Sequence, residues 1–227
     1  MSGANPTSRP AVTLKLATSL DGRIATASGH SKWITGEAAR AEGHKLRAAH
    51  DAVLVGSGTV FADDPELTAR TDPPAAKQPL RIVADSRARV PANARIFTTL
   101  DKGPIAIATL ETSDLDHWPS AQGIQYWMVA KDPASESLDV SELLESAQRA
   151  GVRTLMIEGG GQLAASFVRA GLVDRIEWFR APILLGGDGL PCIAALGLET
   201  VANAPTYERV GVREIGVDLW ESYVRKA

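Results

Sequence analysis

The stretch TLMIEGGGQLAASFVRA, residues 154–170, decides the fold class of this chain. Its first four residues form a short apolar run typical of a buried strand, and residues 161–170 have the composition of a helix. A strand that turns directly into a helix is the unit from which parallel α/β sheets are built. The glycines after Glu158 let the backbone turn sharply, and the start of the helix offers unpaired N–H groups to a phosphate.

Outward from this unit, strands and helices alternate through most of the chain. Apolar patterning predicts further strands near residues 12–16, 51–56, 81–85, 105–108 and 126–129, and a long strand over 175–185 that is broken by Pro182. It also predicts helices over about 36–50, capped by Thr35, and from Ser141 to Gly151. Residues 207–214 and 217–224, separated by Gly216, predict an antiparallel hairpin. We therefore expect a single α/β domain with a mixed, mainly parallel sheet and a C-terminal antiparallel hairpin.

Composition and charge narrow the class of protein. The 227 residues are 44% hydrophobic and 22% charged, as in a globular domain. Lys and Arg number 24 against 27 Asp and Glu, so the net charge is −3, and we expect neither nucleic acid nor a membrane as partner. One cysteine, Cys192, and four histidines without ligand spacing predict no metal site.

We expect a flexible tail over residues 1–10 and a folded domain over residues 11–227. The start of the chain lacks the apolar stretch of a signal peptide, and no run of residues is long and apolar enough for a membrane span. These features predict a cytoplasmic protein.

The glycine turn fits the dinucleotide-binding pattern G-x-G-x-x-A at Gly159, Gly161 and Ala164. In a Rossmann domain that turn follows the first strand, whereas here it comes late and antiparallel patterning follows it. The pattern alone leaves two interpretations open, a phosphate cradle or a tight turn without a ligand.

Further candidate segments also lie in or after predicted strands, where open α/β sheets bind ligands. They are Lys15, Gly56-Ser-Gly-Thr59, Asp63-Asp-Pro-Glu-Leu-Thr-Ala-Arg70 and Asp85-Ser-Arg-Ala-Arg89. Each has a structural alternative: a plain turn for the glycines, solvated turns for the two charged segments, and an edge-strand lysine that prevents aggregation for Lys15.

Taken in order, these segments resemble the reductase domain of the bifunctional deaminase/reductase family of riboflavin biosynthesis. The matching residues run from about residue 11 to the C-terminus and are Lys15, Ser19 to Gly22, Gly29 to Thr35, Leu46 to Ala48, Asp51 to Gly56, Thr59 to Arg70, Asp85 to Arg87, Glu158 to Gly160 and Ala181 to Gly186. The resemblance implies a dihydrofolate-reductase-like fold, NADPH as cofactor and a homodimer. The bifunctional proteins also carry a zinc deaminase module, whose H-x-E and P-C-x-x-C signature is missing here, so we expect a stand-alone reductase.

The resemblance also implies roles for individual residues. NADPH contacts fall on Ala17, Trp33, Thr59, Asp63, Ser86, Gly160, Gly161, Gln162 and Leu163. Substrate contacts fall on Ser31, Arg47, Leu67, Arg70 and Glu158. We expect Arg47 and Arg70 to hold a 5-phosphate, because guanidinium groups bind phosphate through paired hydrogen bonds. We further hypothesise that Lys15 hydrogen-bonds the opened ribose and assists proton movement, and that Glu158 orients it or balances its charge.

The expected reaction is NADPH-dependent reduction of the ribosyl group of a 5-phosphoribosylamino-pyrimidine to ribityl. Two alternatives stay open: a related NADPH reductase of the same fold acting on another substrate, such as a pterin, and a non-catalytic NADPH-binding protein. Lys15, Glu158 and the two arginines favour an enzyme, since a sensor needs only the cofactor half. The pair Ser86-Arg87 suits the 2′-phosphate of NADPH.

Overall fold

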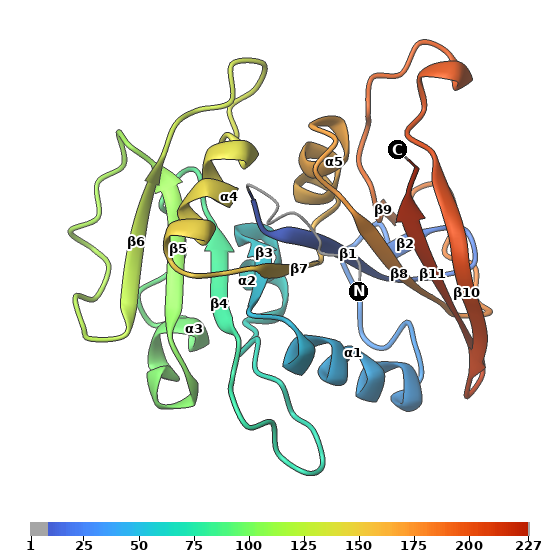
Figure 1. The fold of residues 1–227 in the computed structure, drawn as a ribbon, viewed down its shortest axis with the longest axis horizontal. Coiled ribbons are helices and arrows are strands. Elements are labelled where there is room, and N and C mark those ends of the chain that lie inside the picture. Colours follow the sequence, from blue (N-terminus) through green and yellow to red (C-terminus); the bar gives the residue numbers. More distant parts are fainter. Residues whose placement is uncertain (1–8, 227) are drawn as a thin grey trace, which may run out of the picture.

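The computed structural model describes residues 9–226, and nine strands form one sheet in the order β10-β11-β8-β1-β7-β3-β4-β5-β6 (Figure 1). Their bounds are β1 (Ala11–Thr18), β3 (Ala52–Gly56), β4 (Leu80–Ala84), β5 (Ile105–Leu110), β6 (Ile124–Val129), β7 (Thr154–Glu158), β8 (Arg175–Arg180), β10 (Tyr207–Ile215) and β11 (Asp218–Arg225). All neighbours from β8 to β6 are parallel, whereas β11 is antiparallel to both β8 and β10. The mixed, mainly parallel sheet and its C-terminal hairpin are thus confirmed.

Helices cover both faces of this sheet. They are α1 (Glu37–Ala49), α2 (Ser57–Asp63), α3 (Arg95–Thr98), α4 (Val140–Arg149) and α5 (Gly161–Arg169), with short 3-10 turns η1 (Leu100–Lys102) and η2 (Val201–Asn203). A further small sheet pairs β2 (Arg23–Ala25) with β9 (Leu190–Pro191). The short elements α3, η1, η2, β2 and β9 were not predicted, because runs of two to four residues have no readable periodicity.

The core is divided between the two faces. On one face, α4 and α5 bury Leu143 and Phe167 against Leu14 of β1 and Ile157 of β7. On the other face, α1 packs on a small cluster around Phe179, and α2 and α3 pack on β4 and β5. The hairpin β10–β11 lies at one end of the sheet and β5–β6 at the other (Figure 1).

Alternation along β1 decides where Lys15 points. Leu14 and Leu16 enter the core beneath α4 and α5, so Lys15 faces α1 on the opposite side. Its Nζ lies 5.7 Å from the ring centre of Phe179. A Cβ built on Gly43 of α1 would lie 3.7 Å from the same Nζ, so the helix passes close to the ammonium group.

Two expectations about element ends are wrong. Thr35 does not cap α1: the N-cap is Gly36, whose N–H donates to Asp218 Oδ2 at 2.7 Å. The capping oxygen comes from the hairpin, far along the chain, so local sequence could not reveal it. The strand expected over residues 175–185 ends at Arg180, because the chain then leaves the sheet toward Pro182, which has no N–H for a ladder.

The predicted tail falls mainly on residues 1–8, which lie outside the described residues. Arg9 donates two hydrogen bonds to the carboxylate of Asp174, at 2.8 and 2.7 Å, which ties the start of the described chain to the loop before β8.

Candidate functional site

Four adjacent strands bring the sequence-predicted segments to one edge of the sheet. In the order β1-β7-β3-β4 all are parallel, so their carboxyl ends lie side by side. Lys15 is directly opposite Glu158 in the register of β1 and β7. The segments beginning at Gly56 and Asp85 follow the ends of β3 and β4. Residues that are far apart in the chain therefore share one edge, as expected of an α/β ligand site.

The centre of this edge is an ionic group of Lys15, Arg47 and Glu158, here called the inner cluster. Arg47 Nε and Nη2 donate to the two carboxylate oxygens of Glu158 at 2.6 and 2.9 Å, and its Nη1 donates to the Thr68 carbonyl at 3.0 Å. Lys15 Nζ lies 4.0 Å from Glu158 Oε2. Glu158 is only 9% exposed, so its two cationic neighbours compensate its burial.

Folding lowers the pKa values of both Glu158 and Lys15, but for different reasons. Burial alone would raise the pKa of Glu158, but Arg47 and then Lys15 outweigh it and bring that pKa to about 2. Burial lowers the pKa of Lys15, the Glu158 charge partly opposes this shift, and Arg47 adds to it. Glu158 is thus a permanent carboxylate, whereas Lys15 gives up its proton more readily than a surface lysine.

Arg70 is placed differently from Arg47. Its guanidinium is exposed and shares no printed hydrogen bond or ion pair with the rest of residues 9–226, while its backbone N–H donates to His44 Nδ1 at 3.3 Å. Burial and then the charge of Arg47 lower the pKa of Arg70; Arg95 acts in the same direction, and Glu66 and Glu158 oppose the shift. Such a free guanidinium is ready for an anion, whereas the donors of Arg47 on Nε, Nη1 and Nη2 are already engaged.

His44 is the residue near the site that the sequence analysis missed. Burial, followed by the charges of Arg47 and Arg70, lowers the pKa of His44 to about 4, so its ring is neutral near pH 7. The available signal was its spacing: His44 precedes Arg47 by three residues on α1, and residues three apart share a helix face.

A second part of the edge, here called the glycine cradle, consists of Thr59 and residues 159–163. Gly159 and Gly160 have φ values of 72° and 83°, in the left-handed region that favours glycine. No side chain caps α5, which begins at Gly161. A Cβ on Gly159 would lie 3.2 Å from Thr59 Oγ1, so the hydroxyl borders the turn. These features fit a phosphate at a helix N-terminus.

Gly161 has a second reason to be glycine. A Cβ at this position would collide with the carbonyl oxygen of Pro191, and the Gly161 carbonyl accepts a hydrogen bond from the Ala194 N–H at 2.9 Å. The segment after β9 therefore packs directly on the start of α5. Of the neighbouring positions, Gln162 is exposed and Leu163 is half-buried.

Four of the predicted residues lie outside both the inner cluster and the glycine cradle. Ser31, Trp33, Asp63 and Arg70 are here called the outer rim. Ser31 Oγ donates to Asp63 Oδ1 at 3.3 Å, and Trp33 is 72% exposed with the Arg40 guanidinium 4.5 Å from its ring centre. Within residues 9–226, neither Ser31 nor Trp33 forms a hydrogen bond or ion pair with the inner cluster.

Three more of the predicted residues lie in or beside this edge. Ala17 is half-buried against the cluster around Phe179. Leu67 is buried and has a φ of 56°. Ser86 is half-buried in the turn that the buried Asp85 holds by accepting the N–H groups of Arg89 and Val90 at 2.6 and 2.7 Å.

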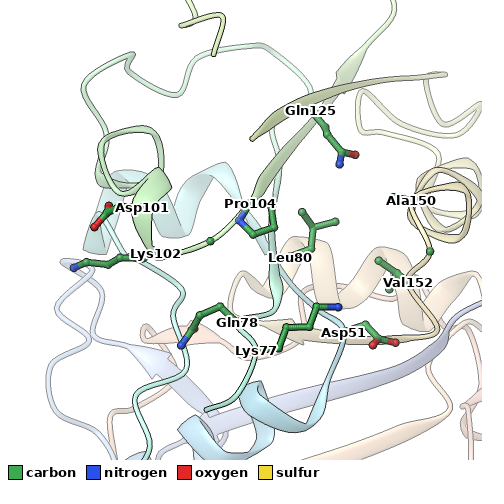
Figure 2. A pocket seen from close by; sticks show the side chains of 12 residues that line it. Asp51, Lys77, Gln78, Leu80, Asp101, Lys102, Pro104, Gln125, Ala150 and Val152 are labelled. Atoms are coloured by element: carbon green, nitrogen blue, oxygen red, sulfur yellow. The ribbon is translucent and has the colours of Figure 1, made fainter. Parts of the chain in front are cut away.

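The opposite edge of the sheet holds a cavity of about 430 Å³ (Figure 2). Its lining includes Asp51, Leu80 and Pro104, which precede or begin β3, β4 and β5, so the cavity opens at the amino ends of the strands. None of the sequence-predicted site residues lines it.

Two further findings concern the described residues as a whole. Residues 9–226 contain no group of three or more His, Cys, Asp and Glu side chains that could hold a metal ion. No helix in that same range is long and apolar enough to cross a membrane. Cys192 is a buried free thiol, and burial raises its pKa.

The fold and site together define an α/β domain with a glycine cradle and a buried Lys–Glu–Arg cluster at the carboxyl edge of its sheet. The RibD C-terminal domain family matches residues 10–220. The chain belongs to this family, as the resemblance implied.

Individual relatives agree with this assignment. RibD, the riboflavin biosynthesis protein of Bacillus amyloliquefaciens, is 38% identical over 216 residues, which are 94% of this chain and 57% of that protein. The chain therefore spans just over half the length of such relatives. The 2,5-diamino-6-ribosylamino-4(3H)-pyrimidinone 5′-phosphate reductase of Methanothermobacter thermautotrophicus is 36% identical over 220 residues, 96% of this chain and 99% of that protein.

Solved structures confirm the fold. RibD of Acinetobacter baumannii superposes with a TM-score of 0.79 at 29% identity, covering 97% of this chain and 59% of that one. The Saccharomyces riboflavin biosynthesis reductase Rib7 superposes with a TM-score of 0.75, covering 98% of this chain and 93% of that one; at 21% identity it supports the fold alone. The fold is therefore that of the RibD-type reductases, the dihydrofolate-reductase-like fold that the sequence led us to expect.

Proposed function

We propose that residues 11–227 form a reductase domain that uses NADPH to convert the ribosyl group of a 5-phosphoribosylamino-pyrimidine to ribityl. The observation that carries this proposal is the placement of the inner cluster beside the glycine cradle, at the carboxyl ends of adjacent strands. The relative from Methanothermobacter, which aligns with this chain over nearly its whole length, is named for a reduction of the same kind.

The glycine cradle has the geometry to bind the phosphates of a dinucleotide. The backbone N–H groups of residues 160–163 and the hydroxyl of Thr59 would hold its phosphates, and Ser86 with Arg87 would hold the 2′-phosphate of NADPH. Ala17, Trp33 and Asp63 complete the proposed NADPH contacts. The bound nicotinamide supplies a hydride, and the remaining chemistry falls to the side chains of this chain.

The two arginines have different proposed tasks. Arg70 has an exposed guanidinium without a hydrogen-bond partner among residues 9–226, so it would bind the 5-phosphate of the substrate directly. Arg47 already binds both oxygens of Glu158, so its main effect on the substrate would pass through that carboxylate. This division differs from the expectation that both arginines act on the phosphate. Ser31 and Leu67 would contact the same substrate.

Lys15 would move the protons. Opening the ribosylamine breaks the bond between C1′ and the ring oxygen, and the proton of the amine nitrogen is transferred to that oxygen as C1′ and nitrogen become doubly bonded. The reduction then adds a hydride to C1′ and one proton to the nitrogen. The lowered pKa of Lys15 suits it to relay the first proton and donate the second, after which water returns a proton to it.

Glu158 would hold the opened sugar in place. Its pKa of about 2 keeps it ionised, so it accepts hydrogen bonds from ribose hydroxyls and stabilises the ammonium form of Lys15 between turnovers.

The test is NADPH oxidation, followed by its absorbance, with the phosphoribosylamino-pyrimidine in its amino and deaminated forms. The proposal requires turnover with at least one of these forms. Turnover with a dihydropterin alone would instead identify a related reductase, and NADPH binding without any turnover would identify a binding protein.

From the family resemblance we also infer a homodimer located in the cytoplasm. Light scattering on the purified protein measures the assembly, and a mass equal to one chain would contradict the dimer.

A further inference from the structure

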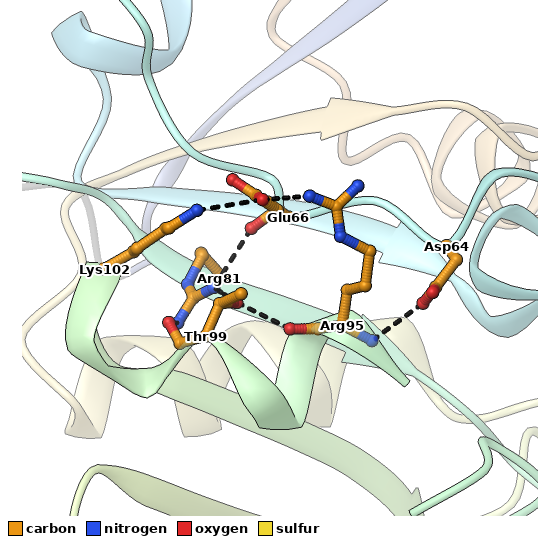
Figure 3. Close-up of polar contacts among 6 residues, drawn as sticks. All are labelled: Asp64, Glu66, Arg81, Arg95, Thr99 and Lys102. Carbon is orange, nitrogen blue, oxygen red and sulfur yellow. Dashed lines mark hydrogen bonds and ion pairs between the residues drawn. The ribbon is translucent and has the colours of Figure 1, made fainter. Parts of the chain in front are cut away.

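The segment Asp64–Arg70, here called the Arg70 loop, is held by side chains from several separate elements. Figure 3 shows the contacts of its first half. Asp64 Oδ1 accepts the N–H of Arg95 at 2.8 Å, and the Glu66 carboxylate pairs with Arg95 and, at 2.9 Å, with Lys102. These contacts fasten the loop to α3 and η1.

A buried arginine also binds the backbone of this first half. Arg81 of β4 is 0% exposed, and its Nη1 donates to the Glu66 carbonyl at 3.1 Å (Figure 3). Its other donors bind Thr99 Oγ1 at 2.9 Å, the Thr99 carbonyl at 2.8 Å and the Gly103 carbonyl. Because a buried guanidinium needs such acceptors, moving the loop here would leave it without one of them.

In the second half of the loop, hydrogen bonds hold the backbone of Thr68, Ala69 and Arg70. The Gln78 side chain donates to the Ala69 carbonyl at 2.9 Å and accepts the Ala69 N–H at 2.8 Å, which reproduces the paired bonds of a β-ladder. His44 Nδ1 accepts the Arg70 N–H, and Arg47 donates to the Thr68 carbonyl. The Thr68 carbonyl, both backbone polar groups of Ala69 and the Arg70 N–H are therefore bound by side chains from elsewhere in the fold.

The side chain of Arg70 itself has no such restraint. Its guanidinium is exposed, and the charges of Arg47 and Arg95 repel it while those of Glu66 and Glu158 attract it. With a mobile backbone, the guanidinium would sample many positions relative to these charges. A fixed backbone limits the positions that the guanidinium can take.

We propose that Gln78 and His44 are positioning residues: they fix the backbone of Ala69 and Arg70, so that the Arg70 guanidinium meets an anionic ligand group without prior ordering of the loop. The inference rests on the proposed function in one respect, that the ligand group is the phosphate of the substrate. Neither residue needs to touch the substrate for this effect.

A pair of substitutions at His44 separates positioning from stability. His44→Asn keeps an acceptor near the position of Nδ1, whereas His44→Leu removes it. Leucine is the better helix former, so a general effect on α1 would favour the leucine variant. We expect His44→Leu to raise the KM for the phosphorylated substrate about tenfold, with kcat and NADPH affinity within about twofold, and His44→Asn to restore most of the loss.

A substitution at Gln78 tests the other contact. Gln78→Glu cannot donate to the Ala69 carbonyl and sets a negative charge against it, so the same rise in KM is expected at unchanged kcat. Gln122→Glu makes the same charge change at an exposed residue before β6, and its KM should match that of the unmodified protein.

The outcomes separate this inference from the proposed function. If the unmodified protein does not oxidise NADPH with the pyrimidine substrate, the proposed function fails. The positioning role is then tested by calorimetry, with the affinity for ribose 5-phosphate measured in place of KM. Weaker binding in His44→Leu and Gln78→Glu, with rescue in His44→Asn, supports the positioning role in either assay. Equal KM or binding in all variants, or a fall in kcat without a change in KM, overturns it.

Discussion

The inner cluster and the outer rim are built in opposite ways, although both contribute to the same edge of the sheet. In the inner cluster, each charge lies on a strand or helix and is close to an opposite charge, so its geometry is set before any ligand arrives. In the outer rim, the side chains lie on loops or, for Asp63, at the last residue of α2, and they are mostly exposed. Pairing compensates the burial of the cluster charges, and the difference agrees with the proposed function, in which the cluster would perform chemistry and the rim would select and hold ligands.

Among the substitutions that test this difference between the inner cluster and the outer rim, Glu158→Gln should have the largest effect on stability and turnover. It leaves Arg47 and Lys15 as like charges without a buried counter-ion, so we expect the free energy of unfolding to fall by about 3–5 kcal/mol. Turnover should fall at least about 100-fold, since the carboxylate that supports proton transfer is lost. Urea unfolding and NADPH oxidation measure the two effects. The control is Glu145→Gln on the exposed side of α4, which should change neither.

The same substitution has a characteristic pH dependence. The pKa of Glu158 falls from an ordinary 4.5 to about 2 on folding, so its contribution to stability is complete above pH 4.5 and is lost as the pH falls toward 2. The acid-induced loss of stability in that range should therefore be smaller in Glu158→Gln than in the unmodified protein. An identical acid profile in the two proteins would argue against the ion pairs described here.

Lys15→Met separates function from stability within the inner cluster. Folding lowers the pKa of Lys15, so the buried ammonium costs stability below its folded pKa, and the cost diminishes as the pH rises toward the unfolded value. Replacing it should raise the melting temperature while turnover falls about 100-fold and NADPH affinity is retained. Lys45→Met, on an exposed part of α1, is the matched control. Equal losses in turnover and NADPH affinity would contradict a role for Lys15 in proton transfer.

Arg70→Ala and Arg47→Ala compare the rim with the cluster directly. Loss of a charge-assisted contact costs about 1.5–3 kcal/mol, so Arg70→Ala should raise the substrate KM by tenfold or more while leaving unfolding nearly unchanged. Arg47→Ala should reduce stability as well, because it removes two hydrogen bonds to a buried carboxylate. Similar stability losses in both variants would mean that the two arginines do not differ as the structure indicates.

Gly159→Ala is expected to have the smallest effect. A side chain at a φ of 72° is strained, and its Cβ would press on Thr59 Oγ1, so we expect about 1–2 kcal/mol of lost stability and weaker NADPH binding. Gly58→Ala, whose Cβ would meet open space in α2, should leave both unchanged or slightly improve stability. Calorimetric NADPH titration of the two variants makes the comparison.

Much of the fold could be predicted from local patterns. The strand and glycine turn at residues 154–161 and the hairpin around Gly216 appear where their periodicity indicated, because a buried strand and a tight turn each require particular residues nearby. The N-terminus of α1 could not be predicted in the same way. Its first free N–H binds Asp218, a partner that proximity in the sequence does not reveal.

The same limit applies to the site. The sequence pointed to Lys15, Arg47, Arg70 and Glu158, but it treated the two arginines as equivalent. Only the folded chain distinguishes them, since Arg47 meets Glu158 across 111 positions of sequence. His44 and Gln78 were not recognised because neither residue type suggests a role until its backbone partner is known.

By itself, the sequence determined the class of fold, the family and the residue types available for chemistry, because periodicity, turns and ordered motifs are local properties of the chain. The tertiary structure decided which of these residues share a charge, which pKa values are shifted and which guanidinium is free. Those properties depend on distance and burial, and both arise only when parallel strands bring distant segments to one edge of the sheet.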